Sequence, residues 1–262
     1  MSGSRHERIR FAQDPLAYIA PGPDEERIDD ARFVLTFSPG RHVWSTTVGR
    51  PRLLHDGVAL TLEEIRALMR ERDAAACVWI VGDEATPPDL VVQLQGHGLE
   101  PTGVSDALLL EEPPGRGPAA GLEVRAVATL DELRASIEIS AAAFDWPSED
   151  ADDERARAED TFLADRADGD SARLLAVDGD RPVATGRCWF SPTGLYLGGG
   201  ATLPTERGRG AMTSLLGAAW DVALARGTPA LVTHGGELSS PILIGLGFRE
   251  VGRVTHLVDR IA

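Results

Sequence analysis

The segment from Leu195 to Gly227 holds the residues best suited to bind a phosphorylated ligand. It reads as a strand over Leu195–Leu203, a loop with two arginines and two glycines, and a helix over Ala211–Ala225 whose apolar residues recur every three or four positions. The first amides of a helix lack intrahelical acceptors and lie at the positive end of the helix dipole. Glycines leave room for phosphate oxygens beside these amides, and arginines add donors. The pattern predicts a diphosphate-binding loop at Arg207, Gly208, Arg209 and Gly210.

Two common phosphate-binding motifs do not fit this loop. A P-loop ends in Gly-Lys-Ser/Thr, and the chain contains no lysine. A dinucleotide-binding fingerprint has a third glycine where this chain has Thr213, and an acidic residue at the end of the next strand, which here ends at His234. Arg207 to Met212 instead resembles the acyl-CoA signature of the GCN5-related N-acetyltransferases (GNATs), Gln/Arg-x-x-Gly-x-Gly/Ala. Met212 departs from it, since that family usually has glycine or alanine there.

The resemblance implies a binding site for acetyl-CoA as co-substrate. Three consecutive glycines, Gly198–Gly200, interrupt the preceding strand, and glycines inside a strand are typical of a bulge or of a close approach to the backbone. In the resembled fold such a bulge separates the fourth strand from the fifth, and the thioester lies between them. The implied binding residues are the strand and loop residues with the first turn of the helix: Ala201, Thr202, Leu203, Arg207, Gly208, Arg209, Gly210, Ala211, Met212 and Thr213.

The candidates for proton transfer follow the next strand. Transfer of an acyl group from a thioester to an amine needs an uncharged amine, a donor to the carbonyl oxygen and a proton for the leaving thiolate. His234 and Glu237 are titratable residues close to the strand end, and water is an alternative to either. Ile242–Phe248 resembles the second GNAT motif, Leu-Tyr-x-x-x-Gly-Phe, with Leu243 in place of the tyrosine often assigned as general acid.

Three functions are compatible with these motifs. The first is an N-acetyltransferase that moves an acetyl group from acetyl-CoA directly to a small amine-bearing acceptor. The second, suggested by Met212 and Leu243, is a regulatory module that binds CoA without transferring the acetyl group. The third, an acetyltransferase acting on tRNA or ribosomal protein, is disfavoured by the charge of the chain.

Composition limits the partners. The 262 residues carry a net charge of −15, with 41 acidic and 26 basic residues. Such a surface repels nucleic acid and attracts amines. The two cysteines, Cys77 and Cys188, lack metal-ligand spacing, and we expect no metal site. No stretch has the length of a signal peptide's apolar region or of a membrane span, so we expect a cytoplasmic protein, monomeric or homodimeric, that binds no membrane.

The two halves of the chain share the same order of strand, turn and helix signals. Residues 77–110 and 230–258 each read as an apolar strand, a turn with an acidic residue, a hydroxyl and proline at the start of a short helix, a Gly-Leu or Gly-Phe end, and a further strand. This indicates an internal repeat, with two unrelated strand–helix–strand units as the alternative. The repeat makes residues 31–112 a partial copy of the GNAT fold that has lost its paired glycines.

The predicted domain organisation has four parts. Residues 1–30 form a loosely held leader with one short helix, residues 31–112 a degenerate GNAT-like domain, residues 113–121 a Pro/Gly-rich linker, and residues 122–262 the catalytic domain. In the N-terminal part we expect a hairpin of 33–37 with 43–48, and a helix over 62–73 that begins at a capping box of Thr61 and Glu64.

The predicted fold class is α/β of the α+β type: a mixed, mostly antiparallel twisted sheet flanked by helices, preceded by a partial copy of the same fold. In the catalytic domain, Asp145 and Trp146 break a helix ahead of an acidic run over 148–160. The resemblance places this region on the acceptor side of the cleft, where these two residues would contact a cationic amine by charge and ring face. A solvated acidic helix face explains the run equally well.

Overall fold

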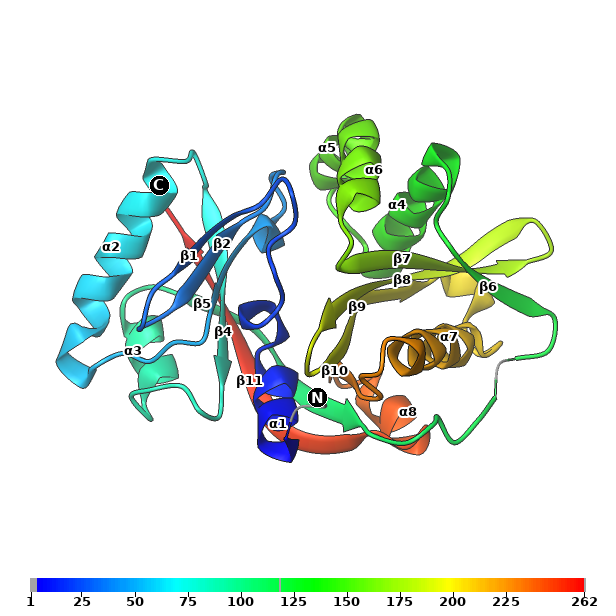
Figure 1. The fold of residues 1–262 in the computed structure, drawn as a ribbon. Helices are drawn as coiled ribbons and strands as arrows, with labels where there is room; N and C mark the ends of the chain where they lie inside the picture. The colour runs from blue at the N-terminus through cyan, green and yellow to red at the C-terminus, as the bar shows by residue number, and fades with distance from the viewer. Residues whose placement is uncertain (1–3, 118, 262) are drawn as a thin grey trace.

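A computed structural model describes residues 4–117 and 119–261 of the protein. Eleven strands among these residues form one continuous sheet, shown in Figure 1, in the order β1-β2-β3-β4-β11-β5-β10-β9-β8-β7-β6. The strands are β1 (Glu26–Asp29), β2 (Val34–Phe37), β3 (Thr46–Gly49), β4 (Ala76–Gly82), β5 (Glu100–Leu110), β6 (Leu122–Ala126), β7 (Ser171–Asp178), β8 (Arg181–Ser191), β9 (Gly194–Thr202), β10 (Leu231–Gly235) and β11 (Arg249–Arg260). The helices are α1 (Arg5–Gln13), α2 (Val58–Arg70), α3 (Leu90–Gly96), α4 (Leu130–Phe144), α5 (Ser148–Ala156), α6 (Ala158–Ala167), α7 (Ala211–Ala225) and α8 (Ser240–Gly245).

The centre of the sheet is built by an exchange of strands between the two halves. The units β4-α3-β5 and β10-α8-β11 are the two copies of the predicted repeat, and both have the strand–helix–strand form. Strand β5 lies between β10 and β11, and β11 lies between β4 and β5. The last strand of each half therefore pairs with the other half, and β11 is seen in Figure 1 crossing from the C-terminal half to end beside α2.

Each face of the sheet carries its own layer. Helices α2 and α3 pack on β1–β4 through the cluster of Phe33, Ile65 and Trp79, and α7 and α8 pack on β5–β10 through the cluster of Leu108, Leu215 and Leu231. The opposite face is covered by α1 at the centre and by α4 with α6 over the C-terminal half. Side chains alternate between faces along a strand, which is why Leu231 contacts α7 while Val232 contacts the α1 side.

The leader differs from its prediction. A short helix is present, α1, with a capping box formed by Ser4 and Glu7. It is not loosely held, because Phe11 and Ala12 are buried against β4, β5, β10 and β11. The sequence of α1 is mostly polar, so the two residues that anchor it do not stand out in a hydropathy pattern.

Three further boundaries differ from the sequence prediction. Residues Val43–Ser45 form a 3-10 turn, so the hairpin strand is only Thr46–Gly49. Helix α2 begins at Val58 without a side-chain cap, and the Thr61 hydroxyl instead accepts from the Arg32 guanidinium. Strand β5, the further strand of the first repeat, extends over eleven residues because its polar first half pairs with β11.

Candidate active site

Strands β9 and β10 are paired at their beginning and then separate. We call the point at which they separate the fork. The strands run parallel and pair only at Leu195 with Leu231 and at Tyr196 with Val232. Beyond Tyr196 the ladder between β8 and β9 shifts register opposite Gly199 and Gly200, and Gly199 has a φ of 60°. The predicted bulge is therefore present at the triple glycine. It leaves the edge of β9 from Leu197 to Thr202 without a partner in β10.

The predicted diphosphate-binding loop lies at the start of α7. Gly208 and Gly210 have φ values of 80° and 83°, a left-handed conformation that glycine adopts without steric cost. Gly210 caps α7 without a side-chain hydrogen bond. Within residues 4–117 and 119–261, no hydrogen bond is donated by the amides from Gly208 to Thr213. These amides fit an anion such as a diphosphate, because each is a donor that the fold leaves unused.

The two arginines of the loop have different surroundings. Arg209 forms ion pairs with Glu206 and with Asp178, the latter at 2.7 Å, and Glu206 is also bridged by Arg181. Arg207 is exposed and donates one hydrogen bond of 3.2 Å to the carbonyl of Ala143 at the end of α4. Arg209 thus ties the loop to the sheet through carboxylates, whereas Arg207 is the arginine available for a phosphate.

Met212 points into the protein and away from the loop. A Cβ atom on Gly200 would lie 2.8 Å from the Met212 Cε, so the methionine fills the space above this glycine. Its side chain packs on the cluster beneath α7. The amide of Met212 remains in the first turn of α7.

Replacing Met212 by alanine tests this placement. We expect Met212→Ala to lower the free energy of unfolding by about 1–3 kcal/mol, because it leaves a gap over Gly200. The dissociation constant for CoA should change less than about threefold, a difference of under 1 kcal/mol. Denaturant unfolding and calorimetry measure the two quantities. A gain in CoA affinity of tenfold or more would mean that the methionine crowds the diphosphate after all.

His234 lies at the end of β10 and is partly buried under α1. Its Nε2 is 2.9 Å from the carbonyl oxygen of Ala12, which requires the hydrogen on Nε2 and leaves Nδ1 as an acceptor. Burial, with a smaller effect of the neighbouring His256, lowers the pKa of His234 to about 4. The imidazole is therefore neutral at pH 7, and the same burial makes it a weaker base than an exposed histidine.

Glu237 is placed less favourably. It is exposed in the turn between β10 and α8, and within the described part of the chain no hydrogen bond or ion pair joins it to His234. Leu243, at the position of the tyrosine in the resembled motif, is buried beneath α8.

Two aromatic residues at the fork are absent from the sequence prediction. The ring of Tyr196 stacks on Trp189 with centroids 5.3 Å apart, and its centroid is 6.0 Å from that of His234. The strand pattern placed Tyr196 correctly in β9. The pairing of β9 with β10 ends at this residue, however, and that follows from the bulge and not from any local motif.

Asp145 and Trp146 lie where α4 ends. Asp145 caps α4 in a left-handed conformation with a φ of 52° and is exposed. Trp146 packs on the cluster of Leu133 and Ile137, and its ring is 5.4 Å from His42 of the N-terminal half. Since Arg207 contacts Ala143, the loop and the end of α4 are neighbours. The end of α4 thus lies next to the loop, and the contact of Asp145 and Trp146 with an acceptor stays a prediction.

The acidic run forms α5 and α6 and is partly neutralised by its own arginines. Arg155 pairs with Glu138 and Asp152, and Arg157 pairs with Asp153 and Glu154. A carboxylate oxygen of Asp153 also accepts from the amide of Arg41 in the N-terminal half. Most of the run is exposed, as a solvated face would be, and Asp153 near its middle contacts the N-terminal half.

Comparison with known proteins identifies the C-terminal half. Residues 135–237, which include the last two thirds of α4, the bulge of β9 and the loop before α7, match the model described as "Acetyltransferase (GNAT) family". The C-terminal half carries a GNAT domain. A search of the curated proteins gives no match.

Solved structures extend the likeness to the whole chain. A GCN5-related N-acetyltransferase from Kribbella flavida superposes with a TM-score of 0.69 at 20% identity, over 97% of this chain and 96% of that one. One from Sphaerobacter thermophilus gives 0.58 at 20% identity, over 89% and 82%. A tandem GNAT protein from the clavulanic acid biosynthesis pathway gives 0.58 at 14% identity, over 99% and 97%. The predicted fold class and the GNAT-like form of the N-terminal half are confirmed.

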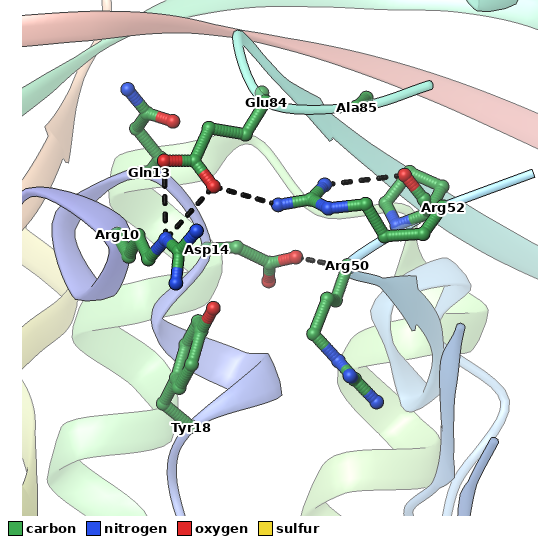
Figure 2. A pocket seen from close by; sticks show the side chains of 10 residues that line it. Arg10, Gln13, Asp14, Tyr18, Arg50, Arg52, Glu84 and Ala85 are labelled. Atoms are coloured by element: carbon green, nitrogen blue, oxygen red, sulfur yellow. Dashed lines mark hydrogen bonds and ion pairs between the residues drawn. The ribbon is translucent and has the colours of Figure 1, made fainter. Parts of the chain in front are cut away.

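The N-terminal half contains a second fork, between β3 and β4, and the end of α1 occupies it. These strands pair in parallel only at Thr47 with Val78 and Val48 with Trp79. A Cβ atom on Gly49 would lie 2.8 Å from an oxygen of Asp14, and one on Gly82 would lie 3.4 Å from Gln13. Around Asp14, Figure 2 shows Arg10 and Arg52 held by Glu84. The fork equivalent to that of the GNAT domain is thus filled by the chain's own leader.

Asp14 gives the protein a testable pH dependence. Burial raises its pKa from 3.8 to about 6, against the opposing effect of the amides of Arg50 and Ala17 that donate to it. The folded state holds this proton more tightly than the unfolded state, so the stability that the group contributes is present below pH 3.8 and is lost as the pH rises to 6.

The isosteric variant Asp14→Asn cannot ionise. We take the free energy of unfolding of Asp14→Asn minus that of the native protein. This difference should be more positive at pH 7 than at pH 4, by up to about 3 kcal/mol. Denaturant unfolding at the two pH values measures the difference. An equal variant-minus-native difference in the free energy of unfolding at pH 4 and pH 7 would contradict the raised pKa of Asp14.

Among the described residues, no group of three His, Cys, Asp or Glu side chains is arranged to hold a metal ion, and no helix is long and apolar enough to cross a membrane. Both cysteines are unpaired and buried.

Proposed function

We propose that the protein is an N-acetyltransferase that transfers an acetyl group from acetyl-CoA directly to a small amine-bearing acceptor. The proposal rests on the position of two binding surfaces next to each other, the free amides before α7 and the unpaired edge of β9. The unused amides from Gly208 to Thr213 lie at the start of α7, and the unpaired edge of β9 leads from the fork to that loop. A ligand with a diphosphate at one end and an amide-rich arm at the other satisfies both sets of donors.

Different residues would bind the diphosphate and the arm of acetyl-CoA. The amides of Gly208 to Thr213, with the Arg207 guanidinium, would bind the diphosphate. The backbone groups of β9 that have no partner in β10, up to Thr202, would pair with the arm and orient the thioester, as an added strand pairs with a sheet edge. Leu203, the last residue predicted to contact the arm, already uses its amide and its carbonyl in hydrogen bonds with Val183 and Glu206. The thioester is already activated, so no covalent enzyme intermediate is needed.

The acceptor enters from the side of α4 in this proposal. Asp145 is exposed there and attracts an amine, in keeping with the net charge of −15. Once the amine has lost its charge and attacked the carbonyl carbon, the nitrogen must release a second proton. Neutral His234 is the nearest imidazole to the fork and would accept it, directly or through water. Glu237 is the second candidate for this role.

A CoA-binding module without transferase activity is the alternative, favoured by one observation. The helix α8 offers the buried Leu243 where the related motif has tyrosine, so a proton donor is lacking at that position. A monomer or homodimer in the cytoplasm fits either function.

Thiol release from acetyl-CoA across a panel of amines separates the two. The transferase is expected to release one thiol per acetylated amine, with a preference for cationic acceptors. Micromolar CoA binding by calorimetry with no release above the hydrolysis background on any amine would favour the module.

A further inference from the structure

We infer that Tyr196 is the proton donor to the leaving sulphur of CoA, a role that rests on the proposed transferase function. Tyr196 is the last residue of β9 that pairs with β10, so it stands at the fork itself. Strand alternation directs its side chain to the face of His234 and α1. The neighbouring backbone, from Gly198 onward, is the free edge that would hold the thioester.

The missing side chain of Gly198 allows the phenol to lie over the strand. A Cβ atom at Gly198 would be 2.9 Å from both Cε1 and Cζ of Tyr196, and equally close to the Trp189 ring. The hydroxyl-bearing end of the ring is therefore above Gly198, and it points along β9 toward the bulge. This gives the first glycine of the triplet a function distinct from that of the bulge at Gly199 and Gly200.

The ring is held and its hydroxyl is left free. Trp189 stacks on one face of Tyr196 with an interplanar angle of 21°, and the Arg187 guanidinium lies 4.9 Å from the Trp189 ring. Within the described residues, the hydroxyl makes no hydrogen bond, and its oxygen is not among the fully enclosed unpaired atoms. A rigid ring with an unused, accessible donor suits a group that must meet a ligand atom.

The phenol is protonated at neutral pH and can therefore donate to the sulphur. Burial raises the pKa of Tyr196 to about 12, with a smaller effect of Asp14, so it carries its proton at neutral pH. The other groups facing it are His234, which is neutral, and Arg187 behind Trp189. Among the hydroxyls of β9 and β10, a phenol is more acidic than that of Thr202 or Thr233.

The step balances in atoms and charge. The amine nitrogen bonds to the carbonyl carbon, the carbon–sulphur bond breaks with its electron pair on sulphur, and the Tyr196 proton passes to that sulphur. The proton released by the nitrogen goes to His234, whose ring lies beside that of Tyr196, or to water, and the phenolate oxygen recovers a proton from the same source. Both side chains end the cycle in their starting forms.

The test uses the whole 262-residue chain, which has two tyrosines, Tyr18 and Tyr196. We expect Tyr196→Phe to keep the CoA dissociation constant within about threefold and to lower kcat about 100-fold. Tyr18→Phe, which changes the residue beside the second fork, is the matched control and should keep kcat.

A second readout needs no acceptor. The ultraviolet absorbance of the thiolate reports ionisation of bound CoA, and the protein's own thiols do not interfere because burial raises the pKa of both, that of Cys188 to about 12. If Tyr196 donates to the sulphur, bound CoA should ionise about tenfold less readily in Tyr196→Phe than in Tyr18→Phe. Gly198→Ala, whose new methyl group displaces the ring, should act in the same direction if the phenylalanine variant fails to fold.

The outcomes are distinct. CoA binding with an unchanged thiol titration in Tyr196→Phe overturns the role of Tyr196 and leaves the proposed function standing. An absence of CoA binding in the native protein overturns the proposed function, and the role of Tyr196 with it. A weaker thiol ionisation in both Tyr196→Phe and Gly198→Ala supports the assignment, whichever amine is the acceptor.

Discussion

Gly208→Glu is expected to raise the dissociation constant for CoA at least about 100-fold while the protein remains folded. A carboxylate about 5 Å from a diphosphate charge costs roughly 3 kcal/mol at an effective dielectric constant of 20, and a factor of 100 in affinity corresponds to about 2.7 kcal/mol. Nothing lies within 4 Å of the position of a Cβ on Gly208, so the new side chain has room in front of the loop.

Gly208→Gln is the matched control. Both variants place a side chain of the same shape at a residue with a φ of 80°, so they share the backbone strain of about 1–2 kcal/mol, and only the charge differs. Calorimetric titration of CoA should show the large loss for glutamate and a much smaller loss for glutamine. Equal losses would mean that the loop tolerates a negative charge and does not bind the diphosphate. Gly210 is less suitable for this pair because a Cβ there would lie 2.8 Å from Ala119 in the linker.

Removal of residues 1–112 is expected to destroy the GNAT domain and not to release it. The deletion takes away β5, which lies between β10 and β11, and β4, the other neighbour of β11. Leu108 and Leu109 are fully buried and Leu110 almost so. At about 1.5–3 kcal/mol for each buried leucine, these three alone approach the 5–15 kcal/mol that stabilises a typical domain. The truncated chain should be insoluble or molten and should not bind CoA.

A chain cleaved within the linker is the control for this deletion. A protease site placed between 113 and 117 and cut after folding leaves every strand pair intact. The two fragments should elute together and bind CoA like the uncut protein, because β5 and β11 still connect the halves. A soluble fragment 113–262 with native CoA affinity would show that the exchange of strands is not needed for stability.

The strand exchange also explains which features could be predicted from the sequence. The loop before α7, the triple glycine and the repeated strand–helix–strand units are local patterns, and each was located from neighbouring residues. The order of strands at the centre of the sheet depends on pairing between residues more than a hundred positions apart, such as Leu109 with Val232. No local pattern distinguishes β11 pairing with β4 from β11 completing its own half.

Some residues around the fork can likewise be predicted from local sequence, and others depend on the tertiary structure. His234 is predictable from the sequence because it follows a strand next to the motif that resembles the acyl-CoA signature. Tyr196 was missed because its significance depends on where β9 leaves β10 and on the missing Cβ of Gly198. The burial of α1 was missed because Phe11 and Ala12 are two apolar residues in a polar helix, and only the shape of the sheet beneath them makes them anchors. Asp14 at the second fork follows from the same docking.

The binding of acetyl-CoA at the start of α7 is the central claim, and a crystal structure of the protein grown with acetyl-CoA tests it most directly. We predict electron density for the diphosphate within hydrogen-bonding distance of the amides between Gly208 and Thr213, with the thioester beside Gly198 and the phenol of Tyr196. Density for the ligand elsewhere, or none in crystals of a protein that shows no calorimetric binding at millimolar acetyl-CoA, would contradict the account.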